Sequence, residues 1–420
     1  MIDVLPALEP SAGLVTLSRI SPPAPPADLL WRCTVELARA EPDRAGGVLS
    51  ARLAGAHGHS STDAMLRGVG EAVERYALHP DGPAPAGAVR ATAAGLGSRA
   101  QRFHGPDVAL GAATDRELTW YPATRLRDGA TVLVPSALVD YPLTGPDADG
   151  FDPSPSGAAA GEGWTAAVRS ALLETVERDA FQVAWERDLR PVRVADPGTD
   201  RTLTRLLRRA AQAGLEAVLA EVPTGVPGVA CAIGVVVDEA GPHPLATLGC
   251  KASDDPARRL LGALQEALQI RSAALVARER ADRWPGGAVR DDDDRLRFLA
   301  SPEGYARVRA WADAFAQDGP GGPGGPGDPA ARRVSTDELV RAMVADGADP
   351  LIVDLTHRLP LGVRESGWAA VKAVPVGYQQ LRIDDTRTDT WNRARLASAE
   401  ARTGLTAGPA PTGVRPHPLP

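Results

Sequence analysis

The 420-residue sequence predicts one large α/β domain in which amphipathic helices pack against buried β-strands. Three observations support this class. Two helical segments, 70–77 and 173–180, share a repeated acidic pattern. Apolar runs of strand length, such as 217–222 and 229–237, lie between the helical segments. Clusters of Pro and Gly, such as 80–85, separate one element from the next.

The acidic pattern reads E-x-V-E-R-x-A, and its second copy begins 103 residues after the first. Glu71 and Glu74 in the first copy, and Glu174 and Glu177 in the second, stand three residues apart and therefore lie on one helix face. A single helix of this kind would most simply be a solvated surface with an ordinary Glu–Arg pair four residues apart. Two copies in one chain favour a shared functional role.

A loop of small residues precedes each acidic helix. Residues 55–60 lie before the first helix, which Ser61 or Thr62 can cap, and residues 154–161 lie before the second. A Gly-rich loop at this place could admit a phosphate to the helix N-terminus, but 55–60 taken alone is most simply a turn. The same arrangement before both helices again favours a common role.

The other elements follow from periodicity and turn residues. In chain order we expect a strand at 13–17, a helix at 91–103, strands at 118–121 and 130–135, a helix at 202–214, strands at 217–222 and 229–237, a third acidic helix from Pro256 that carries Glu266 and Gln269, a helix at 337–345, and strands at 351–355 and 369–375. The four acids Asp291–Asp294 predict a solvated turn, and the Gly-Gly-Pro repeats of 318–329 predict a flexible loop.

Composition narrows the class of protein. The net charge of −7 argues against nucleic acid as the main partner. Cys33, Cys231 and Cys250 have no CxxC spacing, so neither a disulfide framework nor a zinc site is indicated. There is no signal peptide and no apolar run of membrane-spanning length, which predicts a cytoplasmic protein with no membrane association. Lys251 and Lys372 are the only lysines, a bias typical of a GC-rich genome.

The charged residues of the acidic helices are candidate ligands for a metal ion and for phosphate groups. They offer five carboxylates and three arginines: Glu71, Glu74, Glu174, Glu177 and Glu266, with Arg75, Arg178 and Arg271. Carboxylates gathered in one cavity repel unless cations neutralise them, and Mg²⁺ is commonly held by carboxylates together with nucleotide phosphates. The arginines would then meet phosphate oxygens. Since no phosphate-loop, dinucleotide, nucleophile-elbow or HExxH motif is present, the residues alone leave open an ATP-using enzyme, a metal-assisted hydrolase and a structural role.

Several blocks of the sequence resemble motifs of the YcaO family. The family's S-x-x-E-x-x-E-R signature is similar to Gly68-x-x-Glu71-x-x-Glu74-Arg75, and its S-N-G-x-A-A-G and E-x-x-E-R-D blocks are similar to Ser156-Gly157-x-Ala159-Ala160-Gly161 and Glu174-x-x-Glu177-Arg178-Asp179. Its third block is similar to Asp255-Pro256 through Glu266-x-x-Gln269-x-Arg271. Its C-terminal V-D-L-T and P-G-x-Q are similar to Val353-Asp354-Leu355-Thr356 and Gly377-Tyr378-Gln379. The matches run in family order from about Gly55 to the last residue. Gly68 stands where Ser is usual, Ser156 where Asn is usual, and Val376 replaces a Pro.

The resemblance implies an α/β fold of YcaO type, with mostly antiparallel sheets and helices that enclose an ATP site. It implies an ATP-dependent cyclodehydratase that phosphorylates a backbone amide oxygen and forms thiazoline or oxazoline from Cys, Ser or Thr of a ribosomal precursor peptide. The residues that it assigns are Glu71, Glu74, Glu174, Glu177 and Glu266 for Mg²⁺, and Arg75, Ser156, Arg178, Gln269 and Arg271 for ATP.

The resemblance also divides the chain and assigns its tail. Residues 1–50 would pack on a catalytic domain of residues 51–420. The ending Pro416-His417-Pro418-Leu419-Pro420 is similar to the P-x-P-x-P ending of the azoline-forming branch, where the terminal carboxylate, here that of Pro420, is assigned as a base. Because no leader-binding domain precedes the core, a separate ThiF-like partner is expected, and a homodimer is compatible with this scheme.

Two other functions stay open at this point. The same activation could serve backbone thioamidation or amidine formation, which the Pro-rich ending disfavours. A non-catalytic member could act as a scaffold for the precursor peptide, which the intact acids disfavour.

Overall fold

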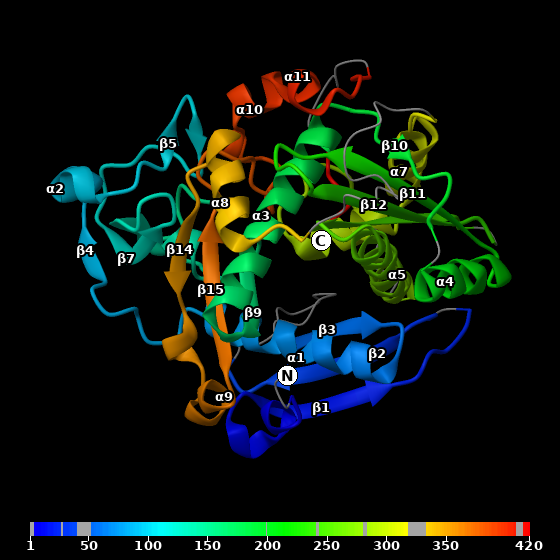
Figure 1. Cartoon of the computed structure of the whole chain (residues 1–420), viewed down its shortest axis with the longest axis horizontal. Helices are drawn as coiled ribbons and strands as arrows, with labels where there is room; N and C mark the ends of the chain where they lie inside the picture. The colour runs from blue at the N-terminus through cyan, green and yellow to red at the C-terminus, as the bar shows by residue number, and fades with distance from the viewer. Residues whose placement is uncertain are drawn as a thin grey trace.

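The computed structural model describes residues 4–26, 28–39, 52–198, 200–240, 243–279, 284–317, 333–408 and 415–420 (Figure 1). Within these residues the strands form sheets of three, four and six strands and one short pair, and every pairing between two of these strands is antiparallel. The predicted flexible loop at 318–329 lies outside the described residues. In the described part of the chain, no helix has the length and apolarity that crossing a membrane requires.

The first acidic helix lies on the N-terminal sheet, whose strand order is β1–β2–β3 (Figure 1). The elements are β1 (Val15–Ser21), β2 (Trp31–Leu37), β3 (Leu53–Gly58) and α1 (Ser61–Leu78). Ser60, rather than Ser61 or Thr62, caps α1 by accepting a hydrogen bond from the backbone N–H of Asp63.

The prediction of a turn at 55–60 was wrong, because most of this segment belongs to β3. A Cβ at Gly55 would lie 2.1 Å from the carbonyl oxygen of Cys33 on β2, and one at Gly58 would lie 2.2 Å from the backbone nitrogen of Ala64 on α1. The glycines therefore serve close packing of backbones inside a strand.

The other two acidic helices cover opposite faces of the four-stranded sheet β10–β11–β12–β13 (Figure 1). The elements are α3 (Gly163–Glu186), β10 (Val192–Arg193), α4 (Arg201–Gln212), β11 (Leu215–Pro223), β12 (Ala230–Asp238), β13 (Leu245–Ser253) and α5 (Pro256–Glu279). Ile233 and Val235 of β12 pack in the core that contains α3, whereas Ala232 and Val236 pack in the core that contains α5. This alternation is the period of two that a strand buried on both faces requires.

The six-stranded sheet has the order β4–β7–β14–β15–β9, with β8 paired to β7. Its elements and the short pair are β4 (Val89–Ala91), β5 (His104–Gly105), β6 (Val108–Ala109), β7 (Leu118–Arg125), β8 (Thr131–Pro135), β9 (Ala158–Glu162), β14 (Leu351–Asp354) and β15 (Trp368–Val374). The predicted loop at 154–161 thus ends in a strand, and β9 leads directly into α3. The predicted helix at 91–103 shrinks to α2 (Ala93–Leu96), since Gly97 takes φ +57° and stops it.

Smaller helices complete the fold. They are α6 (Asp292–Leu299), α7 (Pro302–Asp313), α8 (Thr336–Ala345), α9 (Leu361–Glu365), α10 (Arg393–Ala397) and α11 (Ala399–Thr403). The acids Asp291–Asp294 form the start of α6 and not a solvated turn: Asp291 caps the helix by accepting the N–H of Asp294. Their charges suit the positive end of a helix.

Asp179, the last residue of the E-R-D block, has a structural role. It is 4% exposed and accepts hydrogen bonds from Arg395 Nη2 at 2.7 Å and from the N–H of Gln379 at 2.8 Å. We expect Asp179→Asn to lower the free energy of unfolding by about 3–5 kcal/mol, because it leaves a buried guanidinium short of negative charge. Urea unfolding measures this loss, with Asp313→Asn as the control. Asp313 pairs with Arg309 at the surface, so the control should change stability by less than about 1 kcal/mol.

Candidate active site

A cavity of about 420 Å³ lies where the three acidic helices meet. We call it the acidic cavity. Its charged lining residues are the carboxylates Glu71, Glu74, Glu174, Glu177, Glu266 and Asp292 and the cations Arg67, Arg75, Arg178 and Lys251. All five carboxylates that the family resemblance assigns to Mg²⁺ thus line one cavity, although they come from segments almost 200 residues apart in the sequence.

The two acids of α1 differ in their surroundings. Glu71 accepts a hydrogen bond from Arg75 Nε at 2.7 Å, the ordinary pair four residues apart. Glu74 has no such pair among the described residues. Burial, together with the charges of Glu71 and Glu174, raises the pKa of Glu74 well above its usual value. The charges of Arg75 and Lys372 favour the ionised form of this carboxylate but do not outweigh these effects.

Backbone amides of β13 hold two other acids. Glu177 is 2% exposed, accepts the N–H of Ala252 at 2.8 Å and lies 3.2 Å from Lys251 Nζ. Glu266 accepts the N–H of Cys250 at 2.6 Å. The strand between α3 and α5 thereby fixes one carboxylate from each helix at a set position.

Arg178 is a cation shared by the three acids of α3 and α5, which are Glu174, Glu177 and Glu266. Its nitrogens lie 3.5 Å from Glu174, 3.7 Å from Glu177 and 3.9 Å from Glu266. Burial and the charge of Glu177 still raise the pKa of Glu174 and Glu266 above their usual values, although Arg178 opposes the shift.

The carboxylates that line the acidic cavity are donors of the kind that a divalent cation takes, although no three acidic, His or Cys side chains of the described residues converge as a ready metal site. Six side-chain carboxylates face four cations, and burial, together with the charges of neighbouring carboxylates, raises the pKa of Glu74, Glu174 and Glu266. Oxygen donors from side chains on three fixed helices are the ligands that Mg²⁺ takes. Arg75 and Arg178, on the same walls, could contact phosphate oxygens.

The residues assigned to the nucleotide are only partly brought together. Arg75, Ser156, Arg178 and Gln269 line the acidic cavity. The structure does not bring Arg271 there, although it stands two residues after Gln269. Arg271 is buried elsewhere, where its Nη2 donates to Asp238 at 2.6 Å and its Nη1 to the carbonyl of Pro26 at 3.2 Å.

Gly68 replaces the family's usual Ser for a packing reason. A Cβ at this position would lie 2.7 Å from the side chain of Cys33 on β2. Gly68 is buried against that strand and does not line the acidic cavity.

Both lysines of the chain belong to this region, which the sequence analysis did not foresee. Lys251 lines the acidic cavity. Lys372 of β15 is 3% exposed and donates to the carbonyls of Ser154 and Ser156 at 2.6 and 2.5 Å. It lines a smaller cavity of about 20 Å³ that shares Ser156 and Arg178 with the acidic cavity. The scarcity of lysine in a chain that uses Arg almost everywhere was the one sequence signal that could have drawn attention to these two positions.

Lys372 gives a prediction about pH. Burial lowers its pKa to about 8, against the attraction of Glu174 and Glu74. Between about pH 8 and about pH 10 the unfolded chain holds this proton and the folded chain has lost it, so Lys372 should contribute up to about 3 kcal/mol of stability that grows with pH. The thiols of Cys33 and Cys250 act in the opposite sense in this range, because burial raises their pKa in the folded chain. Urea unfolding of the wild type and of Lys372→Met should therefore give a difference in the free energy of unfolding that shifts in favour of the wild type as the pH rises.

The other lysine is the matched control for this prediction. The charge of Glu177 raises the pKa of Lys251, so its contribution has the opposite sign and is lost only at higher pH. The difference between the wild type and Lys251→Met should therefore not rise across this range. A difference between the wild type and Lys372→Met that stays flat or falls from about pH 8 to about pH 10 would contradict the assignment.

The last described segment ends in the acidic cavity. Pro420 is one of its lining residues. His417 and Leu419 are 0% and 1% exposed. The tail 416–420 is therefore docked and not frayed, as chain ends more often are.

Comparison with known proteins shows the family to which the chain is similar. A family model described as YcaO cyclodehydratase, ATP- and Mg²⁺-binding, matches residues 55–375. A curated relative from Methanothermobacter thermautotrophicus, itself uncharacterised, is 31% identical over 197 residues, which are 46% of this chain and 48% of that protein. The chain thus matches about half the length of this relative.

Three solved structures with the same fold contain a bound substrate, cofactor, nucleotide analogue or peptide. A heterocyclase in complex with substrate and cofactor has a TM-score of 0.70 and 19% identity, covering 98% of this chain and 56% of its own. YcaO from Methanopyrus kandleri bound with AMPPCP and Mg²⁺ has a TM-score of 0.59 and 22% identity over 90% of each chain. A chain of the E. coli microcin synthetase McbBCD complex with pro-MccB17 bound has a TM-score of 0.59 and 12% identity, covering 86% of this chain and 88% of that chain. These likenesses confirm the mixed α/β fold with mostly antiparallel sheets.

Proposed function

The chain belongs to the YcaO family, and from this premise we propose that it is an ATP-dependent cyclodehydratase that forms thiazoline or oxazoline from Cys, Ser or Thr of a ribosomal precursor peptide. One observation carries the proposal: the acids of three helices gather in one cavity, beside three arginines and a docked Pro-rich tail. The family description, with ATP and Mg²⁺ binding, supports the choice of ligand.

We assign the residues of the acidic cavity to two tasks. Glu71, Glu74, Glu174, Glu177 and Glu266 would hold Mg²⁺, and Arg75, Ser156, Arg178 and Gln269 would contact ATP. Arg271 stays outside this assignment, because its guanidinium is committed to Asp238. When bound, ATP supplies a phosphoryl group for the amide oxygen of the peptide. The fixed cations around it are suited to the negative charge that such a transfer gathers.

The reaction balances as a dehydration. The thiol or hydroxyl of the peptide attacks the preceding carbonyl carbon and loses its proton. The carbonyl oxygen takes the phosphoryl group and leaves as phosphate, while the amide nitrogen loses its proton to give the ring double bond. We propose the carboxylate of Pro420 as the base for these protons, because Pro420 lies in the acidic cavity.

A partner protein completes the proposal. We propose that a separate ThiF-like protein binds the leader of the precursor and delivers it, and that the chain works in the cytoplasm. The McbBCD structure supports a scheme of this kind, since it is a complex with a precursor, pro-MccB17, bound. We further propose residues 51–420 as the catalytic domain with residues 1–50 packed on it, which the shared sheet of β1, β2 and β3 supports.

The product tests the proposed function. Incubation of the chain with ATP, Mg²⁺, a precursor peptide and the partner protein should give a peptide that has lost one water per modified residue, as mass spectrometry measures. The chain without the partner should process the same peptide poorly. Replacement of oxygen by sulfur would instead indicate thioamidation, and an unmodified peptide under all conditions would indicate a scaffold.

A further inference from the structure

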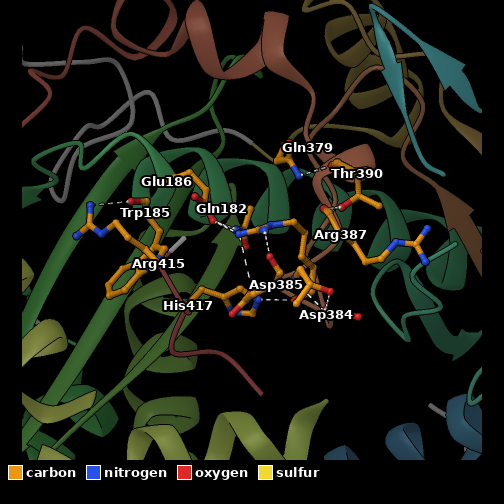
Figure 2. A network of polar contacts seen from close by, with 12 residues as sticks. Gln182, Trp185, Glu186, Gln379, Asp384, Asp385, Arg387, Thr390, Arg415 and His417 are labelled. Carbon is orange, nitrogen blue, oxygen red and sulfur yellow. Dashed lines mark hydrogen bonds and ion pairs between the residues drawn. The ribbon is translucent and has the colours of Figure 1, made fainter. Parts of the chain in front are cut away.

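The tail that reaches the acidic cavity is held by buried polar contacts (Figure 2). Arg415 donates to Asp188 Oδ1 at 3.0 Å, and its guanidinium lies 5.3 Å from the ring centre of Trp185. The next residues pass into the interior, where His417 has no exposed surface. Both Asp188 and Trp185 belong to the C-terminal end of α3 or the turn after it, so the tail is tied to the helix that carries Glu174.

Arg295 of α6 makes the central contact. Its side chain is fully buried, and Nη1 donates to the carbonyl oxygen of His417 at 2.8 Å. Nη2 donates to the carbonyl oxygens of Ile383 at 2.7 Å and Arg382 at 3.2 Å. The nearest carboxylate oxygens, those of Asp385, lie farther away, at 3.5 Å. The guanidinium therefore uses its short hydrogen bonds to join the backbone of the tail to the backbone of 382–383.

His417 makes a second link between the same two segments. Its Nε2 contacts the carbonyl oxygen of Arg382 at 2.5 Å, so this nitrogen must carry the proton, and its Nδ1 accepts the N–H of Leu419 at 3.4 Å. The ring also packs edge-on against Phe181, with ring centres 6.1 Å apart. Burial and the charge of Arg295 lower the pKa of His417 well below its usual value, which keeps this neutral tautomer.

The charges of this network are balanced inside the protein. Arg382 pairs with Glu186 and lies 3.7 Å from Asp385, and all three side chains are buried. Burying two arginines and two carboxylates gains little stability over an apolar core of the same size, because the cost of removing the charges from water is large. What such a network supplies is a defined geometry for the backbone that it binds.

We infer that Arg295 is a positioning residue that holds residues 417–420 so that Pro420 stays in the acidic cavity. This inference rests on the proposed function, in which Pro420 serves the reaction. Arg295 itself does not line the acidic cavity and touches neither peptide nor nucleotide in this scheme.

The test uses Arg295→Met and Arg295→Lys, with His417→Ala as a variant on the tail side in case the arginine variants fold poorly. Lysine keeps a cation beside Asp385 but lacks the planar fork that reaches three carbonyls. Hydrogen exchange at the amides of residues 417 and 419 should be about 10- to 100-fold faster in each variant. Cyclisation kcat should fall about 10- to 100-fold, while the affinity for an ATP analogue with Mg²⁺ stays within about twofold.

Two comparisons separate positioning from a general loss of structure. Arg297→Gln changes another arginine of α6, which pairs with Asp294 at 3.2 Å, and should leave tail exchange and kcat unchanged. In a chain that lacks residues 416–420, Arg295→Met should lower kcat no further, since the two changes act through one element.

Each outcome decides between the inference and the proposed function. Tail amides that stay protected in Arg295→Met and His417→Ala would overturn the inference, whatever the activity. Tail amides that exchange faster without any loss of cyclisation would confirm that Arg295 positions the tail. That result would instead overturn the role of Pro420 in the proposed function.

Discussion

Glu174→Gln should lower ATP turnover about 100- to 1000-fold and leave the fold intact. Glu174 faces the acidic cavity from α3, and its nearest cation, Arg178, is shared with two further carboxylates. The substitution keeps the shape of the side chain and removes the charge that would hold Mg²⁺. It also removes one repelling charge from the cavity, so the protein without nucleotide should be as stable as the wild type or slightly more stable.

Phosphate release and urea unfolding measure the two parts of this prediction. Glu71→Gln should lower phosphate release by a similar factor, because Glu71 lines the same cavity from α1. Glu303→Gln is the matched control: Glu303 is half-exposed on α7 and pairs with Arg307, outside the acidic cavity. Wild-type phosphate release by either cavity variant would contradict a shared Mg-nucleotide site.

A single Gly added after Pro420 should lower the rate of cyclisation about 100-fold while nucleotide binding changes little. The extension moves the terminal carboxylate away from the place where Pro420 lines the acidic cavity. It leaves the buried contacts of His417 and Leu419 in place. The prediction therefore concerns the position of the carboxylate and not the stability of the tail.

Removal of residues 416–420 should lower cyclisation by a similar factor, with some loss of stability because Leu419 is fully buried. The rate of ring formation by mass spectrometry, the affinity for an ATP analogue and the melting temperature together separate the two effects. An extended enzyme that cyclises its peptide at the wild-type rate would show that the Pro420 carboxylate is not the base.

The acidic helices were predictable from the sequence because their information is local. Three-residue spacing places Glu71 with Glu74 and Glu174 with Glu177 on one helix face in any amphipathic helix. The contact between the two helices depends on the tertiary structure and cannot be derived from local spacing. The repetition of E-x-V-E-R-x-A nevertheless indicated a shared site, because two copies are not expected on a solvated surface.

The parts that could not be predicted depend on contacts between distant segments. β3 and β9 consist mostly of Gly and Ala, which have weak strand preference. They form strands because their backbones pair with β2 and β15 and, for β3, pack against α1. Arg271 has the spacing of a site residue, yet its long side chain reaches Asp238 on β12 instead. The place of Lys372 beside two carbonyl oxygens has no local sequence pattern, although the scarcity of lysine was visible.

The fate of the peptide oxygen tests the central claim most directly, which is that the acidic cavity activates a backbone amide by phosphorylation. A precursor labelled with ¹⁸O at the carbonyl before the reacting Cys, Ser or Thr is incubated with the chain, its partner, ATP and Mg²⁺. The account predicts one labelled phosphate for each ring formed, and neither product in Glu174→Gln. Rings that form while the phosphate stays unlabelled and the label appears in water would contradict it.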